Sequence, residues 1–141
     1  MSIDSIELWH RRARPDVTTK TFDVQLGCHL EEVVEMLACL KFNGGWHNLR
    51  YELTLLADRL KSGGETAIIC DRKELLDSLA DQIVTAVGVG HNAGMKTVDA
   101  VDAVNSSNWS KFDDEGFPIF NEHGKIAKGP NYKRPILDNL Y

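Results

Sequence analysis

The stretch Asp23–Leu40, DVQLGCHLEEVVEMLACL, decides the fold class of this chain. Asp23 is a residue type that caps helices well, and the glycines at 44 and 45 follow the end of the stretch. We therefore expect a helix over residues 23–40. Its apolar residues recur at intervals of three and four, as on one face of an amphipathic helix: Leu26, Leu30, Val33, Val34, Leu37 and Leu40.

The same spacing of apolar residues predicts further helices on both sides of this stretch. We expect them over residues 3–13, 46–61, 71–90 and 96–109. The segment GFPIF–NEHG–KIAKG that follows is typical of a β-hairpin with a glycine-containing turn, and GPNYKRP after it is typical of an ordered loop. The sequence thus predicts an all-α bundle of four to five helices, with a hairpin and loop extension over residues 112–141.

Length and composition favour one soluble domain over residues 1–141. The net charge of −5 argues against a general affinity for nucleic-acid polymers. No apolar run approaches the roughly 18 residues of a membrane span, and no signal-peptide core is visible. Three cysteines without a CxxC pair make a poor disulfide framework. We therefore expect a reduced cytoplasmic protein without a membrane partner.

Two rows of acidic residues are the candidate metal-binding residues of the chain. Within HLEEVVEML, Glu32 and Glu35 share a helix face, as do Glu31 and Glu35. Within ELLDSLADQIV, the spacing of three and four recurs at Glu74, Asp77 and Asp81. Carboxylates this close repel one another, and a hard divalent cation would convert the repulsion into coordination. The alternative is that both rows are solvated helix faces.

HLEEVVEML followed by DSLADQIVTAVG resembles the superfamily of MazG and phosphoribosyl-ATP pyrophosphohydrolases. The resemblance aligns Glu32 and Glu35 with the family's Glu-x-x-Glu pair, and Asp81 with its final aspartate. The family's second glutamate would fall at Ser78, a departure for which Asp77 is the nearest substitute. WHRRARPDVTTKTFDVQLGCHLEEVVEM and NSSNWSKFDDEGFPIFNEHGKIAKGPNYKRP are similar to a stand-alone subgroup common in phages and bacteria.

This resemblance implies a MazG-like bundle with an oligomeric four-helix core, as a homodimer or homotetramer. It also implies hydrolysis of a nucleoside triphosphate to the monophosphate and pyrophosphate, in the host cytoplasm if the chain is phage-encoded. Two or three Mg²⁺ or Mn²⁺ ions would be bound per site. The candidate metal ligands are Glu31, Glu32, Glu35, Asp77 and Asp81.

Other side chains are candidates for catalysis and for binding the nucleotide. Glu32 or Glu35 could take a proton from the attacking water, and Lys111 could offset charge developing on pyrophosphate. Basic and amide groups suit phosphate oxygens, and aromatic rings suit a base. The nucleotide-binding candidates are Trp9, His10, Gln25, Trp46, Asn92, Asn108, Lys111, Lys125, Lys128 and Tyr132. For Trp9 and Trp46, we favour core packing over a contact with the base, because tryptophan buries a large area.

The substrate stays open at this point. A purine deoxynucleotide such as dGTP is our preferred expectation, with phosphoribosyl-ATP or dUTP/dCTP as related alternatives. A different class of function is a non-enzymatic binding or assembly protein on a degenerate bundle, which the serine at position 78 keeps open.

Overall fold

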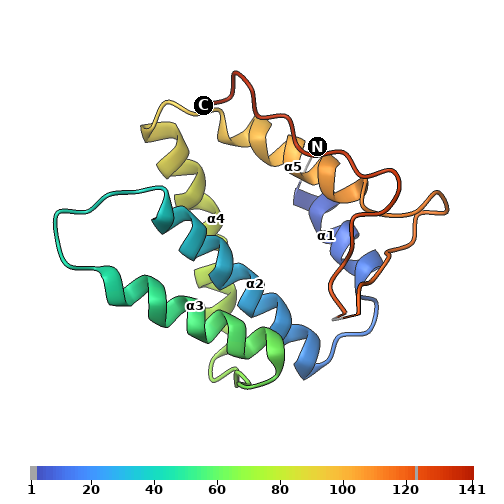
Figure 1. The fold of residues 1–141 in the computed structure, drawn as a ribbon, viewed down its shortest axis with the longest axis horizontal. Helices are drawn as coiled ribbons and strands as arrows, with labels where there is room; N and C mark the ends of the chain where they lie inside the picture. Colours follow the sequence, from blue (N-terminus) through green and yellow to red (C-terminus); the bar gives the residue numbers. More distant parts are fainter. Residues whose placement is uncertain (1–2, 123) are drawn as a thin grey trace. The chain divides into compact units, whose positions relative to one another are not determined.

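The computed structural model describes residues 3–122 and 124–141 and shows five α-helices in that part of the chain (Figure 1). They are α1 (Ile3–Ala13), α2 (Thr19–Ala38), α3 (His47–Ser62), α4 (Arg72–Asn92) and α5 (Thr97–Trp109). The predicted all-α class is confirmed. The chain divides into two compact units. One is residues 16–70, with α2 and α3, and the other joins the residues up to Pro15 to Asp71–Tyr141.

Helices α2 and α3 pack side by side and form the unit of residues 16–70 (Figure 1). Ala57 and Leu60 are buried on α3, and Gly27 is buried on α2. A Cβ atom at Gly27 would lie 2.7 Å from the carbonyl oxygen of Ala57. The absence of a side chain at Gly27 therefore lets the two helix backbones approach closely.

The predicted start of the second helix at Asp23 is wrong. Helix α2 begins four residues earlier and is capped by Thr18, whose side chain accepts a hydrogen bond from the Thr21 backbone N–H in a capping box. Asp23 is only 5% exposed, and its Oδ1 accepts a hydrogen bond from the Ala67 backbone N–H at 2.9 Å. The carboxylate of Asp23 thus ties the segment after α3 to α2 instead of capping a helix.

The second unit has an aromatic core between α1, α5 and the residues after α5. Trp9 is stacked on Phe112, with ring centroids 5.6 Å apart and planes 10° apart. The indole Nε1 of Trp9 donates to the Asn108 carbonyl oxygen at 2.9 Å. Trp109 and Ile126 pack against this core. Burial of these large rings fixes the end of α5 against α1.

The predicted C-terminal hairpin appears as a turn with one antiparallel bridge, between Phe120 and Ile126. The Asn121 N–H donates to the Lys125 carbonyl at 2.9 Å within this turn. No strand forms in the described part of the tail. The next hydrogen-bonded pair of a longer ladder would join Phe117 to Gly129. The Phe117 N–H donates instead to the Asp113 Oδ1 at 2.8 Å, and the Gly129 N–H donates to the Lys111 carbonyl. The expected strand pair is thus not confirmed.

Helix α4 is the longest of the described helices, and Asp71 caps it by accepting from the Lys73 and Glu74 backbone N–H groups at 3.0 Å each. It meets α5 through Gly90, which is buried next to Thr97. Among the described residues, no helix combines the length and apolar character that crossing a bilayer requires.

Candidate functional site

The first acidic row lies on α2, where the structure confirms the helical spacing that the row depends on. Glu31 is half-buried, whereas Glu32 and Glu35 are exposed. The Oε1 atom of Glu31 accepts a hydrogen bond from the Lys61 Nζ on α3 at 2.8 Å. Lys61 also lies 3.3 Å from the Oδ1 atom of Asp58. One of the three carboxylates in the row is therefore already neutralised by a lysine.

Lys61 is well placed to keep its charge at this position. Its side chain is only 19% exposed. Desolvation alone lowers the pKa of Lys61, but the hydrogen bonds and charges of Glu31 and Asp58 outweigh it, so the pKa is raised above its ordinary value of 10.5. The ammonium therefore competes with any metal ion for Glu31, and the assignment of Glu31 as a ligand stays a prediction.

Glu32 and Glu35 have the donor chemistry that a hard divalent cation prefers. Both are carboxylates, three residues apart on one helix, and both are exposed. Carboxylate oxygens suit Mg²⁺ and Mn²⁺. The residues present fit a magnesium or manganese ion in the chemistry of their donors.

The second acidic row lies on α4, which belongs to the other unit. Glu74, Asp77 and Asp81 are all exposed, and so is Ser78. Within residues 3–122 and 124–141, no three His, Cys, Asp or Glu side chains are already grouped as they would be around a metal ion. Each row therefore offers carboxylates on its own helix, and their joint use of one ion stays a prediction.

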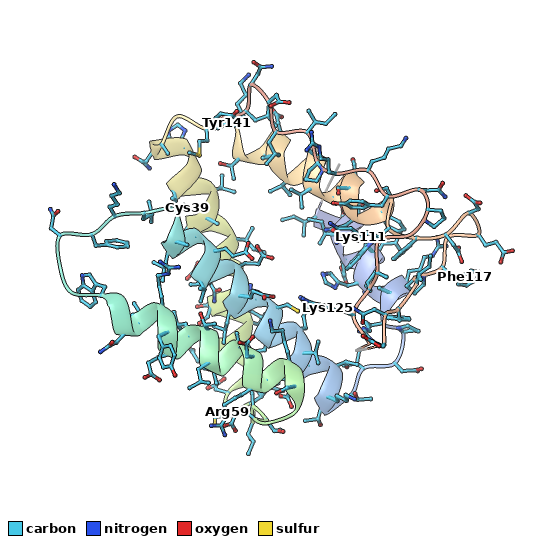
Figure 2. The ribbon with its side chains drawn as sticks, viewed as in Figure 1. Cys39, Arg59, Lys111, Phe117, Lys125 and Tyr141 are labelled. Atoms are coloured by element: carbon cyan, nitrogen blue, oxygen red, sulfur yellow. The ribbon has the colours of Figure 1, made fainter. Side chains whose placement is uncertain are left out.

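Two pairs of the predicted nucleotide-binding residues come together near the end of α5. The Nζ atom of Lys111 donates to the Asn108 Oδ1 at 2.7 Å and lies 6.0 Å from the centre of the Trp9 ring. The Nζ atom of Lys128 lies 4.7 Å from the centre of the Tyr132 ring. Lys125 is exposed on the same C-terminal segment as Lys111 (Figure 2). The unit that contains α5 thus carries a group of lysines beside aromatic rings.

The other predicted nucleotide-binding residues are scattered. Trp9 is 8% exposed and belongs to the core, as the packing alternative predicts, and the neighbouring His10 packs edge-on against it. Burial lowers the pKa of His10 below its ordinary value of 6.5. Gln25 and Trp46 lie in the unit of residues 16–70, where Trp46 is 61% exposed. Asn92 donates to the Gly88 carbonyl at the end of α4.

Two features of the molecule have no signal in the sequence patterns. Lys61 sits thirty residues from Glu31, and no local spacing connects the two. A pocket at the end of α5 is also unexpected: it brings Ser106 and Ser110 next to the loop 130–133.

No protein-family model matches this chain, and neither the curated proteins nor the solved structures include one that matches it significantly.

Proposed function

We propose that this chain is a metal-dependent nucleoside triphosphate pyrophosphohydrolase built on a MazG-like helical bundle. The observation that carries the proposal is the exposed Glu32–Glu35 pair on α2, next to a third carboxylate that Lys61 neutralises. The resemblance of HLEEVVEML and DSLADQIVTAVG to that superfamily supports the same conclusion. The proposed reaction converts a nucleotide, preferably a purine deoxynucleotide such as dGTP, to its monophosphate and pyrophosphate.

Glu32, Glu35, Asp77 and Asp81 are the residues that would hold Mg²⁺ or Mn²⁺, with Glu31 joining them only if it leaves Lys61. When bound, such ions neutralise phosphate charge and lower the pKa of a coordinated water. Carboxylate ligands suit both kinds of ion. Two or three such ions per site would balance the negative charge of a triphosphate.

The side chains of this chain have separate parts in the proposed reaction. Glu32 or Glu35 takes the proton of the attacking water. Lys111 offsets the charge that develops on pyrophosphate, and Asn108 holds the Lys111 ammonium in place through its 2.7 Å hydrogen bond. A lysine held in this way loses less side-chain entropy when it binds an anion than a freely rotating one.

Pyrophosphate release, measured with and without Mg²⁺ over a panel of nucleoside triphosphates, tests the proposal. We expect Glu35→Gln to abolish turnover while the helical circular dichroism signal stays unchanged, because the charge at this position matters only when a cation is bound. Glu52→Gln is the matched control, since Glu52 is exposed on α3 outside both acidic rows.

Turnover of Glu35→Gln near the wild-type rate at saturating Mg²⁺ would remove Glu35 from the site. Release of pyrophosphate only from phosphoribosyl-ATP, dUTP or dCTP would contradict the proposed substrate and support the proposed type of reaction. No release from any nucleotide would favour the non-enzymatic binding protein.

We also propose that the chain assembles as a homodimer or homotetramer. Large apolar side chains of α4 are exposed in the single chain, and a partner would remove them from water. They include Leu76, Leu79, Ile83, Val84 and Val87. Sedimentation velocity at micromolar concentration is expected to show a species at least twice the mass of the chain, and a monomer would contradict the assembly.

A further inference from the structure

The pocket at the C-terminal end of α5 is formed within one unit of the chain. Its lining comes from the last turn of α5 and from the loop after the bridge: Ser106, Ser110, Pro130, Asn131, Tyr132 and Lys133. Its volume of about 650 Å³ lies within the range of pockets that hold small molecules. It is therefore large enough for a ligand and is made of residues that the acidic rows do not use.

The loop that forms one wall of the pocket is fastened to the helix that forms the other. The Lys133 backbone N–H donates to the Ser110 Oγ at 2.8 Å, and that hydroxyl donates to the Ser107 carbonyl at 2.7 Å. The Gly129 N–H donates to the Lys111 carbonyl at 3.3 Å. A Cβ atom at Gly129 would lie 2.7 Å from that same carbonyl oxygen, so the close approach requires glycine. The pocket is thus preformed, which reduces the entropy cost of binding.

The chemistry of the lining suits a flat heteroaromatic ring with hydrogen-bonding edges. Tyr132 is half-buried, and the ammonium of Lys128, 4.7 Å from the ring centre, holds the ring by a cation–π contact. Pro130 adds apolar surface beside it, and the hydroxyl of Ser106 adds a group that both donates and accepts hydrogen bonds. Stacking on a tyrosine is tolerant of which base is bound.

The same lining is unfavourable for a phosphate group inside the pocket. Ser106 and Ser110 lie in the last turn and at the C-cap of α5, where the helix dipole places partial negative charge. Asn131, in the facing loop, is hydrogen-bonded to the carboxylate of Asp114. Positive charge comes from Lys133 in the lining and from Lys128 outside it, 4.7 Å from the Tyr132 ring centre, which suits phosphates that leave the pocket beside a stacked ring.

We infer that this pocket binds the base of a nucleotide by stacking it on Tyr132, so that the C-terminal segment, and not Trp9 in the core, recognises the base. The choice of a nucleotide as ligand rests on the proposed function. Ser106 and Lys133 are recognition residues in this assignment, in addition to Tyr132.

Binding of the four deoxynucleoside 5′-monophosphates to the full chain in EDTA, measured by isothermal titration calorimetry, tests the inference without any hydrolysis. We expect at least one monophosphate to bind, and Tyr132→Leu to weaken it by about tenfold or more. Tyr132→Phe keeps the ring and is expected to restore binding to within about threefold of the wild type. Tyr141→Leu is the matched control, because Tyr141 is exposed and does not line the pocket.

A second variant keeps the test decisive if Tyr132→Leu does not fold. Ser106→Leu changes an exposed helix position and fills the pocket without removing the tail's packing, so it is expected to block the same monophosphate. 2-Deoxyribose 5-phosphate is expected not to compete. Equal competition by this sugar phosphate, an unchanged affinity in both variants, or no binding of any monophosphate would each overturn the inference.

The outcomes separate this inference from the proposed function. If a monophosphate binds in a Tyr132-dependent way but no triphosphate releases pyrophosphate, the proposed enzymatic activity is refuted and the base-binding pocket is supported. If Tyr132→Leu releases pyrophosphate with an unchanged KM, the base-binding role of the pocket is refuted and the proposed enzymatic activity is supported.

Discussion

Replacing Gly27 by alanine is expected to destabilise the α2–α3 unit, although glycine is a poor residue for a helix interior. The new Cβ would lie 2.7 Å from the Ala57 carbonyl oxygen and 2.8 Å from the Lys61 Cγ. The carbonyl belongs to the α3 backbone, so the helices must move apart, and overpacking of this kind costs about 1–3 kcal/mol. Alanine regains about 1 kcal/mol of helix propensity. The free energy of unfolding should therefore fall by up to about 2 kcal/mol.

Gly88 on α4 provides the matched control, because a Cβ atom there would meet nothing within 4 Å. Gly88→Ala should therefore raise the free energy of unfolding by about 0.5–1 kcal/mol. Urea unfolding followed by circular dichroism at 222 nm measures both changes. The Gly27→Ala midpoint should fall by up to about 1 M at a urea slope of about 2 kcal/mol/M, which is typical of a small protein. A rise in the midpoint for Gly27→Ala, like that for Gly88→Ala, would refute the close helix packing.

Two further predictions concern the metal ligands and the pH dependence. Asp77→Ala should raise the Mg²⁺ concentration needed for half-maximal pyrophosphate release far more than Ser78→Ala. The reason is that a neutral hydroxyl is a poor ligand for a hard dication. The reverse result would show that the alignment of α4 with the family's second glutamate is wrong. The pKa of His10 is lowered by burial, so the unfolded state binds more protons, and the free energy of unfolding should fall as the pH drops below 6.5. In urea titrations at several pH values, His10→Gln should weaken that dependence, and an identical slope in the variant would contradict the assignment to His10.

Regular local spacing was enough to predict the helices of this chain. The predicted helix over residues 3–13 agrees with α1 at both ends, and the predicted helix over residues 96–109 differs from α5 by one residue at its start. Apolar side chains three and four residues apart can share one buried face only on a helix. The carboxylate spacing on α2 and α4 followed from the same geometry, so the two acidic rows were predictable as rows.

Where two residues were equally good helix caps by their local sequence, tertiary contacts decided which of them is used. Thr18 and Asp23 are both good caps, and Asp23 is withdrawn from that role because its carboxylate is buried against the Ala67 N–H. The tail shows the same effect: Phe120 and Ile126 pair, but the hydrogen bonds from Phe117 to Asp113 and from Gly129 to Lys111 end the pairing after one bridge.

The amino-acid sequence by itself predicted that five helices form and which carboxylates share a helix face, because both depend on neighbours within one or two turns. Only the tertiary structure decided that Glu31 pairs with Lys61, that Trp9 is a core residue bonded to Asn108, and that Tyr132 lines a pocket with Ser106. These contacts join residues from 26 to 99 positions apart, by the numbering of each pair. Such partners are selected by the packing of whole helices and loops, which no local pattern of residues specifies.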